Sequence, residues 1–200
     1  MSKQSDLVTV ARDAGASGYV NIAGDTMTGA LTATSFTGDG SALTGVGKVF
    51  QVIQSFRTSL LSTTSSSYQN ILSATITPSS ASSRFLIMCT GQEGTDAGDG
   101  NSYSQHVLQR GSTDIYLGDA SGSAGRASAG RFGRQGSFMS DAVAFMYLDS
   151  PNTTSPVTYN WLFRSPRGPS WRVFIGGSLN DGFFGYTRVP TNMIVMEIAE

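Results

Sequence analysis

The pattern of hydrophobic and polar positions divides the chain near Gly47. Before that residue, large apolar side chains are few and are separated by Gly, Ser and Thr. From Lys48 onward, alternating or continuous apolar segments recur between clusters of Gly, Pro, Asn and Ser, as in antiparallel strands joined by turns. The pattern therefore predicts an N-terminal extension over residues 1–47 and a β-structured head over residues 48–200.

The strand signals in the head are regular. KVFQVIQSFRT and NILSATITP alternate between apolar and polar residues, and SRFLIMCTG is a continuous apolar run typical of a buried strand. The other candidate strands are SYSQHVLQR, TDIYLGD, SFMSDAVAFMYLD, VTYNWLFRS, SWRVFIGGSL, GFFGYTRV and NMIVMEIA. No segment of the sequence has a convincing apolar stripe of helical period. About ten strands in this arrangement predict an all-β, jelly-roll-like antiparallel sandwich.

Two Gly-rich segments interrupt the strand pattern. They are GQEGTDAGDGNS (91–102) and GDASGSAGRASAGRFGRQGS (118–137). Both are predicted to be loops, and the second is long for a compact domain. Long loops without secondary structure are usually functional or mobile, so the second segment is a candidate binding loop.

Composition and charge exclude several classes of partner. Only 14% of the 200 residues are charged and the net charge is −1, so no global attraction to nucleic acid or to an anionic membrane is expected. No apolar run approaches the roughly 18 residues of a membrane span, and no secretory signal is visible, so membrane insertion is not expected. Cys89 is the single cysteine, which rules out a disulfide within the chain and predicts folding in a reducing cytoplasm.

The segment GDTMTGALTATSFTGDGSALTGV (24–46) has too little to bury as a single copy. Several copies wound together could still be ordered, because each chain would contribute a few apolar residues to a shared axis and the closed association would satisfy the strand edges. The residues predicted to line that axis are Met27, Leu31, Phe36, Leu43 and Val46. Gly and Asp-Gly would form the tight corners between them.

The same segment is similar to the neck of tail fibre and other appendage proteins of bacteriophages. Variants of G-D/G-T-M-T-G-x-L and A-T-S-F-x-G-D-G-S-x-L-T-G-V are common in those necks. The head resembles the β-sandwich tips of the same proteins in SATITPSSASSRFLIM, LQRGSTDIYLGD, YLDSPNTTSPVTYNW and the closing MIVMEIAE. The likeness covers most of residues 22–200.

This resemblance implies a homotrimeric fibre of the virion tail, assembled in the cytoplasm of the bacterial host. Residues 1–21 would be the arm that attaches to a tail or baseplate protein, an assignment that rests on position alone. Residues 22–47 would form the trimeric neck, and residues 48–200 would form the head that recognises a host receptor. Because association would bury the neck and the flat faces of the heads, the isolated monomer is expected to be unstable.

The sequence offers little catalytic or metal chemistry. The single histidine, His106, lies in a predicted strand, where a structural histidine with satisfied hydrogen bonds is the leading interpretation. An ion held by three copies of His106 at a threefold axis and a catalytic role are the alternatives. Neither a nucleophile elbow nor a cluster of His, Cys and carboxylates supports an enzyme or a metal site, so no catalysis, cofactor or metal is predicted.

Two segments combine arginines with aromatic residues and form the candidate receptor site. The candidate residues are Arg126, Arg131, Phe132 and Arg134 in the long Gly-rich segment, and Arg164, Arg167 and Trp171 in FRSPRGPSWR. Guanidinium groups suit carboxylate and phosphate, and aromatic faces suit sugar rings, so the hypothesis is a glycan-binding surface. The alternative is that these arginines are solvated loop charges or pair with acids at the trimer interface.

Three functions follow for the head. The first is recognition of a host surface glycan without catalysis, strengthened by several weak contacts acting together. The second is a structural baseplate or decoration protein whose head binds another virion protein. The third is a glycan-degrading tip, which would need two carboxylates in a cleft about 5 to 10 Å apart.

Overall fold

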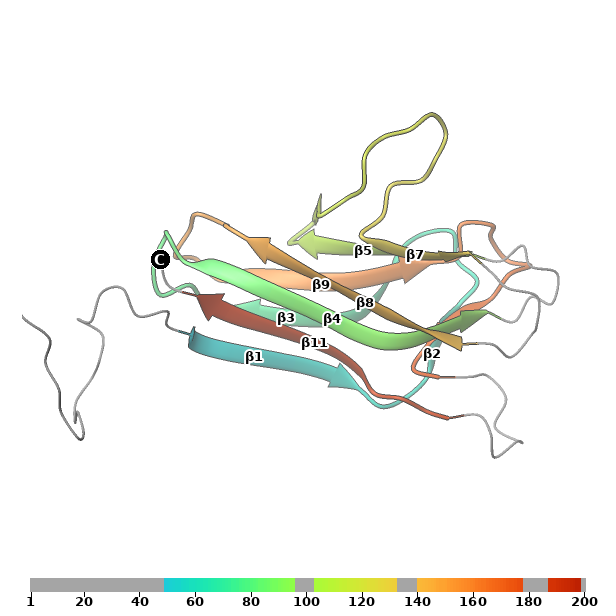
Figure 1. Cartoon of the computed structure of the whole chain (residues 1–200), viewed down its shortest axis with the longest axis horizontal. Coiled ribbons are helices and arrows are strands. Elements are labelled where there is room, and N and C mark those ends of the chain that lie inside the picture. Colours follow the sequence, from blue (N-terminus) through green and yellow to red (C-terminus); the bar gives the residue numbers. More distant parts are fainter. Residues whose placement is uncertain (1–48, 96–102, 133–139, 178–186, 199–200) are drawn as a thin grey trace, which may run out of the picture. The chain divides into compact units, whose positions relative to one another are not determined.

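The computed structural model describes residues 49–95, 103–132, 140–177 and 187–198, drawn in colour in Figure 1. All of them belong to one compact unit, Gly45–Glu200. These ranges contain strands, turns and connecting segments but no helix, which confirms the predicted all-β class. The predicted arm and neck, with Met27, Leu31, Phe36, Leu43 and Val46, lie outside the described residues.

Sheet A is a six-stranded antiparallel sheet. Its path runs through β1 (Val49–Arg57), β11 (Thr191–Ile198), β4 (Arg84–Thr95), β10 (Val173–Ile175) and β2 (Leu61–Thr63). The sixth strand, β8 (Ser140–Asp149), pairs with β4 over most of its length.

Sheet B is a five-stranded antiparallel sheet. Its path runs through β3 (Gln69–Ile76), β9 (Val157–Arg164), β5 (Tyr103–Arg110) and β6 (Thr113–Ile115), and β7 (Ala129–Phe132) also pairs with β5. The long strands of both sheets run along the horizontal axis of Figure 1.

The chain alternates between the two sheets. It passes from β3 in sheet B to β4 in sheet A, back to β5, β6 and β7 in sheet B, and then through β8 in sheet A to β9 in sheet B. Such alternation is how a jelly roll is built, and it lets the inner faces of both sheets enclose one core. The predicted sandwich head therefore agrees with the observed topology.

The inner faces of the strands supply the core. Along β9 and β11 every second residue is buried, as expected for strands with one face inward. The largest fully buried apolar or aromatic side chains include Trp161, Tyr159, Phe85, Phe163 and Ile87. Cys89 lies fully buried in the same core, and burial raises the pKa of its thiol well above the ordinary value.

The outer faces of the two sheets differ in polarity. On sheet B, Thr75 pairs with Thr158 (Oγ1 to Oγ1, 2.8 Å) and the Ser73 hydroxyl donates to Asn160 Oδ1 (2.7 Å). On sheet A, the outward residues of β1 and β8 include exposed hydrophobic side chains such as Val52 and Met146. An antiparallel sheet with one face on the core normally has polar residues on the other face, which contacts water. The outer face of sheet B follows this pattern, and the outer face of sheet A does not.

The segment 116–128 rises from sheet B as a projecting loop, seen at the top of Figure 1. Backbone bonding between Gly118 N and Ala127 O (3.2 Å) closes its base. Tyr116 at its start has a φ of 56°, and its ring stacks on Tyr147 with centroids 5.0 Å apart. The stack holds Tyr116 in a backbone conformation that few non-glycine residues adopt.

The sequence prediction missed some strands and misplaced some boundaries. β4 continues to Thr95, so the first five residues of the predicted loop 91–102 are strand. The predicted loop 118–137 contains β7. The Ala and Gly residues of β7 give it little apolar patterning, and the strand forms because it pairs with β5. β2 was not predicted, and most of the predicted strand GFFGYTRV lies outside the described residues.

Candidate functional site

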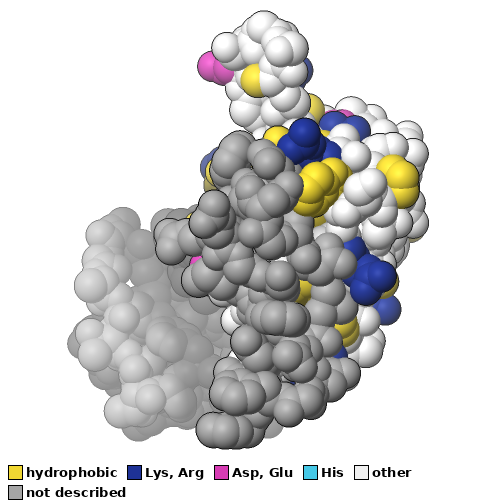
Figure 2. Space-filling model, turned by 90° about the vertical axis from the view of Figure 1, so that its right-hand side faces the viewer, with side chains coloured by type: hydrophobic (Ala, Val, Ile, Leu, Met, Phe, Trp, Pro, Cys, Tyr) yellow, Lys and Arg dark blue, Asp and Glu magenta, His cyan; other side chains and the backbone are white. Residues whose placement is uncertain are grey.

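One end of sheet B gathers two arginines, three aromatic side chains and an amide. This group, called the arginine–aromatic surface below, consists of Tyr68, Tyr103, Gln105, Arg164, Arg167 and Trp171. Figure 2 faces the corresponding end of the molecule and shows arginine side chains next to hydrophobic ones. β9 ends here and β5 begins here, so residues from the two strands and the segments next to them meet.

Arg164 is fixed by the pairing of β9 with β5. Its register partner is Gln105, whose Oε1 accepts hydrogen bonds from Nε (3.0 Å) and Nη2 (2.7 Å) of Arg164. Nη1 donates to the backbone oxygen of Ser66 (3.3 Å). These contacts use three of the five guanidinium N–H groups, which leaves donors for a carboxylate or phosphate.

Tyr68 lies under the Arg164 guanidinium. The Arg164 Cζ atom is 4.5 Å from the centre of the Tyr68 ring, which is a favourable cation–π distance. Partial burial raises the pKa of Tyr68, and the positive charge of Arg164 opposes that increase without cancelling it. The phenol is therefore neutral at physiological pH and can donate as well as accept a hydrogen bond.

Arg167 contacts two aromatic rings. Its Cζ lies 5.5 Å from the Tyr103 ring centre and 5.4 Å from the Trp171 ring centre. Tyr103 comes from β5, whereas Trp171 comes from the turn after β9, so the arginine links a strand to a turn. Cation–π contacts of this kind contribute about 0.5–1 kcal/mol each at exposed sites.

The turn that carries Arg167 and Trp171 is stabilised by its own hydrogen bonds. The buried Ser165 accepts from Gly168 N (3.1 Å) through its carbonyl and donates from its hydroxyl to the Trp171 carbonyl (2.6 Å). Ser165 N also donates to Ser65 O (2.9 Å), which attaches the turn to the segment before β3. Gly168 has a φ of 78°, a value that glycine adopts readily. These bonds fix the turn that carries Arg167 and Trp171.

The other predicted receptor residues fall into three groups. Arg131 and Phe132 belong to β7, where their backbones pair with Ser104 and Tyr103, so this strand lies beside the surface. Arg126 lies in the projecting loop, where its Nε donates to Gly118 O (2.7 Å). Arg134 lies outside the described residues. The structure therefore brings together Arg164, Arg167 and Trp171, places the backbone of β7 next to them, and uses Arg126 to close a loop.

Sequence reasoning missed Tyr68, Tyr103 and Gln105. Tyr103 and Gln105 start a strand whose neighbour could not be identified from the sequence, because pairing of β5 with β9 joins residues 49 to 59 positions apart. Tyr68 lies in a Ser-rich segment just before β3 that carried no motif. One signal was available: in a strand every second residue points to the same face, so Tyr103, Gln105, Val107 and Gln109 were expected to lie on one side of the predicted strand.

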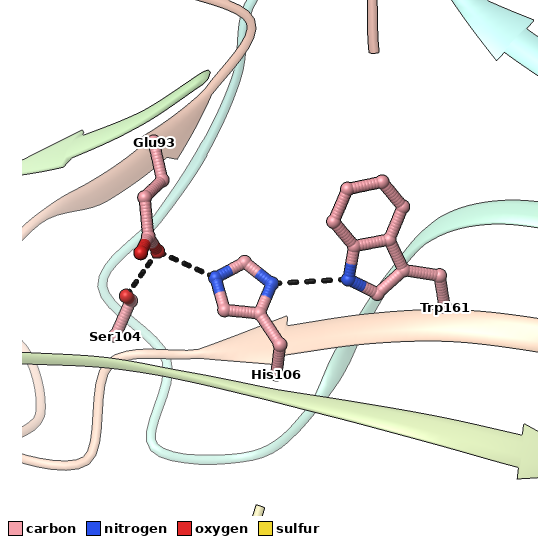
Figure 3. Close-up of polar contacts among 4 residues, drawn as sticks. All are labelled: Glu93, Ser104, His106 and Trp161. Carbon is pink, nitrogen blue, oxygen red and sulfur yellow. Dashed lines mark hydrogen bonds and ion pairs between the residues drawn. The ribbon is translucent and has the colours of Figure 1, made fainter. Parts of the chain in front are cut away.

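His106 lies in the interior, in a four-residue polar network (Figure 3). Its Nε2 lies 2.6 Å from Glu93 Oε2, and the Ser104 hydroxyl donates to the same carboxylate oxygen. On the other side of the ring, Trp161 Nε1 donates to His106 Nδ1 (3.1 Å). All four side chains are buried.

These contacts define the state of the imidazole. An indole N–H can only donate, so Nδ1 of His106 must be the acceptor and the proton of the neutral ring lies on Nε2. Nε2–H then donates to the Glu93 carboxylate. With a proton on Nδ1, the Nδ1–H of His106 and the indole N–H of Trp161 would face each other with no acceptor between them. Because both ring nitrogens are bonded in the interior, the predicted structural role of His106 agrees with the geometry, and neither nitrogen is left for an ion at a threefold axis.

Two further buried carboxylates have structural partners. Asp149 accepts from Arg110 Nη1 (3.0 Å to each oxygen) and from the Tyr159 hydroxyl (2.7 Å). Burial and the neighbouring Asp149 raise the pKa of Tyr159. Glu197 Oε1 accepts from Ser79 N (2.6 Å), and Gln51 Nε2 donates to its other oxygen. These acids hold the sandwich together and are not exposed to a substrate.

Within the residues that the structure describes, no three His, Cys, Asp or Glu side chains gather as they would around a metal ion. The described residues also form no helix with the length and apolar character needed to cross a bilayer. Comparison with known proteins finds no matching family model and no matching curated protein.

Proposed function

We propose that this protein is a short bacteriophage tail fibre whose head binds an acidic glycan on the host surface through the arginine–aromatic surface. The single observation that carries the proposal is the pair Arg164 and Arg167, each held against aromatic rings at one end of sheet B. Guanidinium N–H donors beside aromatic faces match a sugar that carries a carboxylate or phosphate.

In this proposal the remaining parts have the roles that the sequence resemblance implies. Residues 1–21 attach to a tail or baseplate protein, residues 22–47 associate as a homotrimeric neck, and the heads present three copies of the surface to one cell. Multivalency would then compensate for weak binding by each head. The protein would act in the virion tail, without catalysis and without a cofactor.

A glycan-degrading tip has less support. It would need two carboxylates facing a sugar. The buried acids Glu93, Asp149 and Glu197 instead accept hydrogen bonds from neighbouring side chains in the interior.

A structural baseplate or decoration protein is the second candidate, and one observation favours it. Part of the outer face of sheet A carries exposed apolar side chains, and broad apolar patches on proteins commonly mark protein contacts. That face is on the other side of the sandwich from the outer face of sheet B, so the two candidate functions use different surfaces.

The proposal is tested with the full chain on an array of purified bacterial capsular and lipopolysaccharide glycans, both acidic and neutral. We expect binding confined to acidic glycans and weakened by salt, because screening reduces interactions between exposed charges. Arg167→Gln should lower the affinity for the tightest glycan at least tenfold. Arg84→Gln, at the start of β4, is the matched control and should bind as the unsubstituted chain does.

Binding to no glycan on the array would contradict receptor recognition of this class and favour the structural alternative. Equal affinity of Arg167→Gln and the unsubstituted chain would keep the function but remove the site assignment.

A further inference from the structure

The outer face of sheet A carries apolar side chains across four neighbouring strands. The register places Val52 of β1 opposite Met196 of β11, Met196 opposite Leu86 of β4, and Leu86 opposite Leu148 of β8. Residues directly opposite each other in a sheet point to the same side. These four side chains therefore form one apolar row across the sheet.

A second row lies beside the first. Ile194 of β11 is opposite Met88 of β4, and Met88 is opposite Met146 of β8. At the two edges of the sheet, Val52 is 51% exposed and Met146 is 62% exposed. The two rows together are called the apolar face below.

The apolar face is nearly free of charge. Among the described outward residues of β1, β11, β4 and β8, Arg84 at the start of β4 is the one charged side chain. A charged face would repel its own copy and select a partner of opposite sign. A neutral apolar face is complementary to a copy of itself, because no like charges meet.

The position of β1 relates this face to the rest of the chain. β1 is an edge strand that begins at Val49, and Lys48 alone separates it from the segment 22–47. Val49 and Phe50, the first residues of the strand, are 56% and 46% exposed. If necks of several chains associate, the β1 strands of those chains begin next to one another, which brings the apolar faces within reach.

We infer that the apolar face packs against copies of this same chain and forms the contact between heads. Two features indicate that the partner is a copy of the same chain: the near absence of charged side chains on the apolar face, and the position of β1 next to the segment 22–47. The second feature rests on the trimeric neck of the proposed function. The glycan-binding role of the arginine–aromatic surface is not needed for this inference.

The test combines the mass in solution with methionine oxidation of the full, unsubstituted chain. Light scattering should give three times the chain mass of 21.0 kDa. Dilute hydrogen peroxide should then oxidise Met146 at least tenfold more slowly than a freely exposed methionine, despite its 62% exposure in a single copy. Met193, which is fully buried in the core, is the internal reference for complete protection.

A substitution gives an independent readout. Met146→Lys should convert the oligomer to smaller species at the same protein concentration, because several lysines would meet in the contact. Thr75→Lys, on the exposed polar face of sheet B, is the matched control and should leave the mass unchanged. Slow reaction of the buried Cys89 with a thiol reagent checks that both variants are folded.

Each combination of results decides the inference. A trimer with protected Met146 supports it. A trimer with freely oxidised Met146 would show that another surface makes the contact and would overturn the inference while leaving the trimer of the proposed function intact. A monomer would overturn both this inference and the proposed trimer, and protection of Met146 in that monomer would indicate that residues 1–48 cover the face.

Discussion

The indole N–H of Trp161 donates a hydrogen bond to Nδ1 of His106 across 3.1 Å in the interior of the sandwich. β5 and β9 supply the two residues, so the bond ties neighbouring strands of sheet B through their side chains as well as their backbones. It also determines which ring nitrogen carries the proton, because the indole cannot accept. The only histidine of the chain is therefore a structural residue whose tautomer is set by a tryptophan.

Trp161→Phe should destabilise the protein by about 2–4 kcal/mol. The substitution leaves the buried Nδ1 of His106 without a donor and removes part of a fully buried ring. Trp171→Phe is the matched control, since Trp171 is the only other tryptophan and its ring forms a cation–π pair with Arg167. That control should change stability by less than about 1 kcal/mol. Denaturant unfolding followed by circular dichroism measures both, and equal effects would contradict the role of the Trp161–His106 bond.

The fold class was predictable because alternating patterns and turn residues are local signals. β9 and β11, whose residues alternate between buried and partly exposed, were predicted within one or two residues. β7 was not, because Ala129 and Gly130 carry no pattern and the strand exists through pairing with β5. The local sequence pattern predicts strands that bury one face. It does not predict strands that form only because they pair with a neighbouring strand.

The site was predictable in composition but not in arrangement. Arg164, Arg167 and Trp171 are close in sequence, so a single short segment was enough to nominate them. Gln105 and Tyr103 join them only through the register of β5 against β9, which the sequence does not reveal. The partners of His106 were missed for the same reason, because Glu93 comes from sheet A and Trp161 from another strand of sheet B.

Glu197 should make stability depend on pH in the acid range. Burial alone would raise the pKa of this carboxyl, but hydrogen bonds from Ser79, Ser83 and Gln51 outweigh burial and lower it. A carboxyl with a lowered native pKa stabilises the fold fully above the unfolded value, near 4.3, and this contribution is lost as pH falls through the native pKa. The free energy of unfolding should therefore decrease below about pH 4.3.

Glu197→Gln measures how much of that decrease comes from this residue. At pH 7 the variant should be less stable by about 1.5–3 kcal/mol, since a charged acceptor is lost, and its stability should fall less steeply with acid. Asp119→Asn, an exposed carboxylate in the projecting loop, is the control and should follow the curve of the unsubstituted chain. If Glu197→Gln kept the full acid dependence, the network around Glu197 would not be its source.

Cys89 should not react with a thiol reagent in the folded protein. Its side chain is fully buried and burial raises its pKa, so both access and thiolate formation are suppressed. In increasing denaturant, one thiol per chain should become reactive with the same midpoint as the loss of circular dichroism. Complete labelling within minutes in buffer would show that β4 opens readily, which the pairing of this strand on both sides argues against.

Gly177 should tolerate alanine much less well than Gly111. Gly177 has a φ of 126°, and an added Cβ would overlap the carbonyl oxygen of Thr187 and lie 3.0 Å from Arg188 Cα. Gly177 also forms an isolated bridge with Arg188, so the chain before β11 is held by this close approach. Gly111 has a φ of 60° and no heavy atom within 4 Å of an added Cβ, so only the backbone conformation costs energy there.

The expected loss of stability is about 1–2 kcal/mol for Gly111→Ala, from the left-handed conformation alone. For Gly177→Ala it should be at least about 2 kcal/mol larger, because backbone atoms cannot move aside as a flexible side chain can. Thermal and denaturant unfolding of the two variants measure the difference under the same conditions. Similar losses would mean that the segment joining Gly177 to β11 shifts freely, and in that case the bridge to Arg188 contributes little to holding sheet A together.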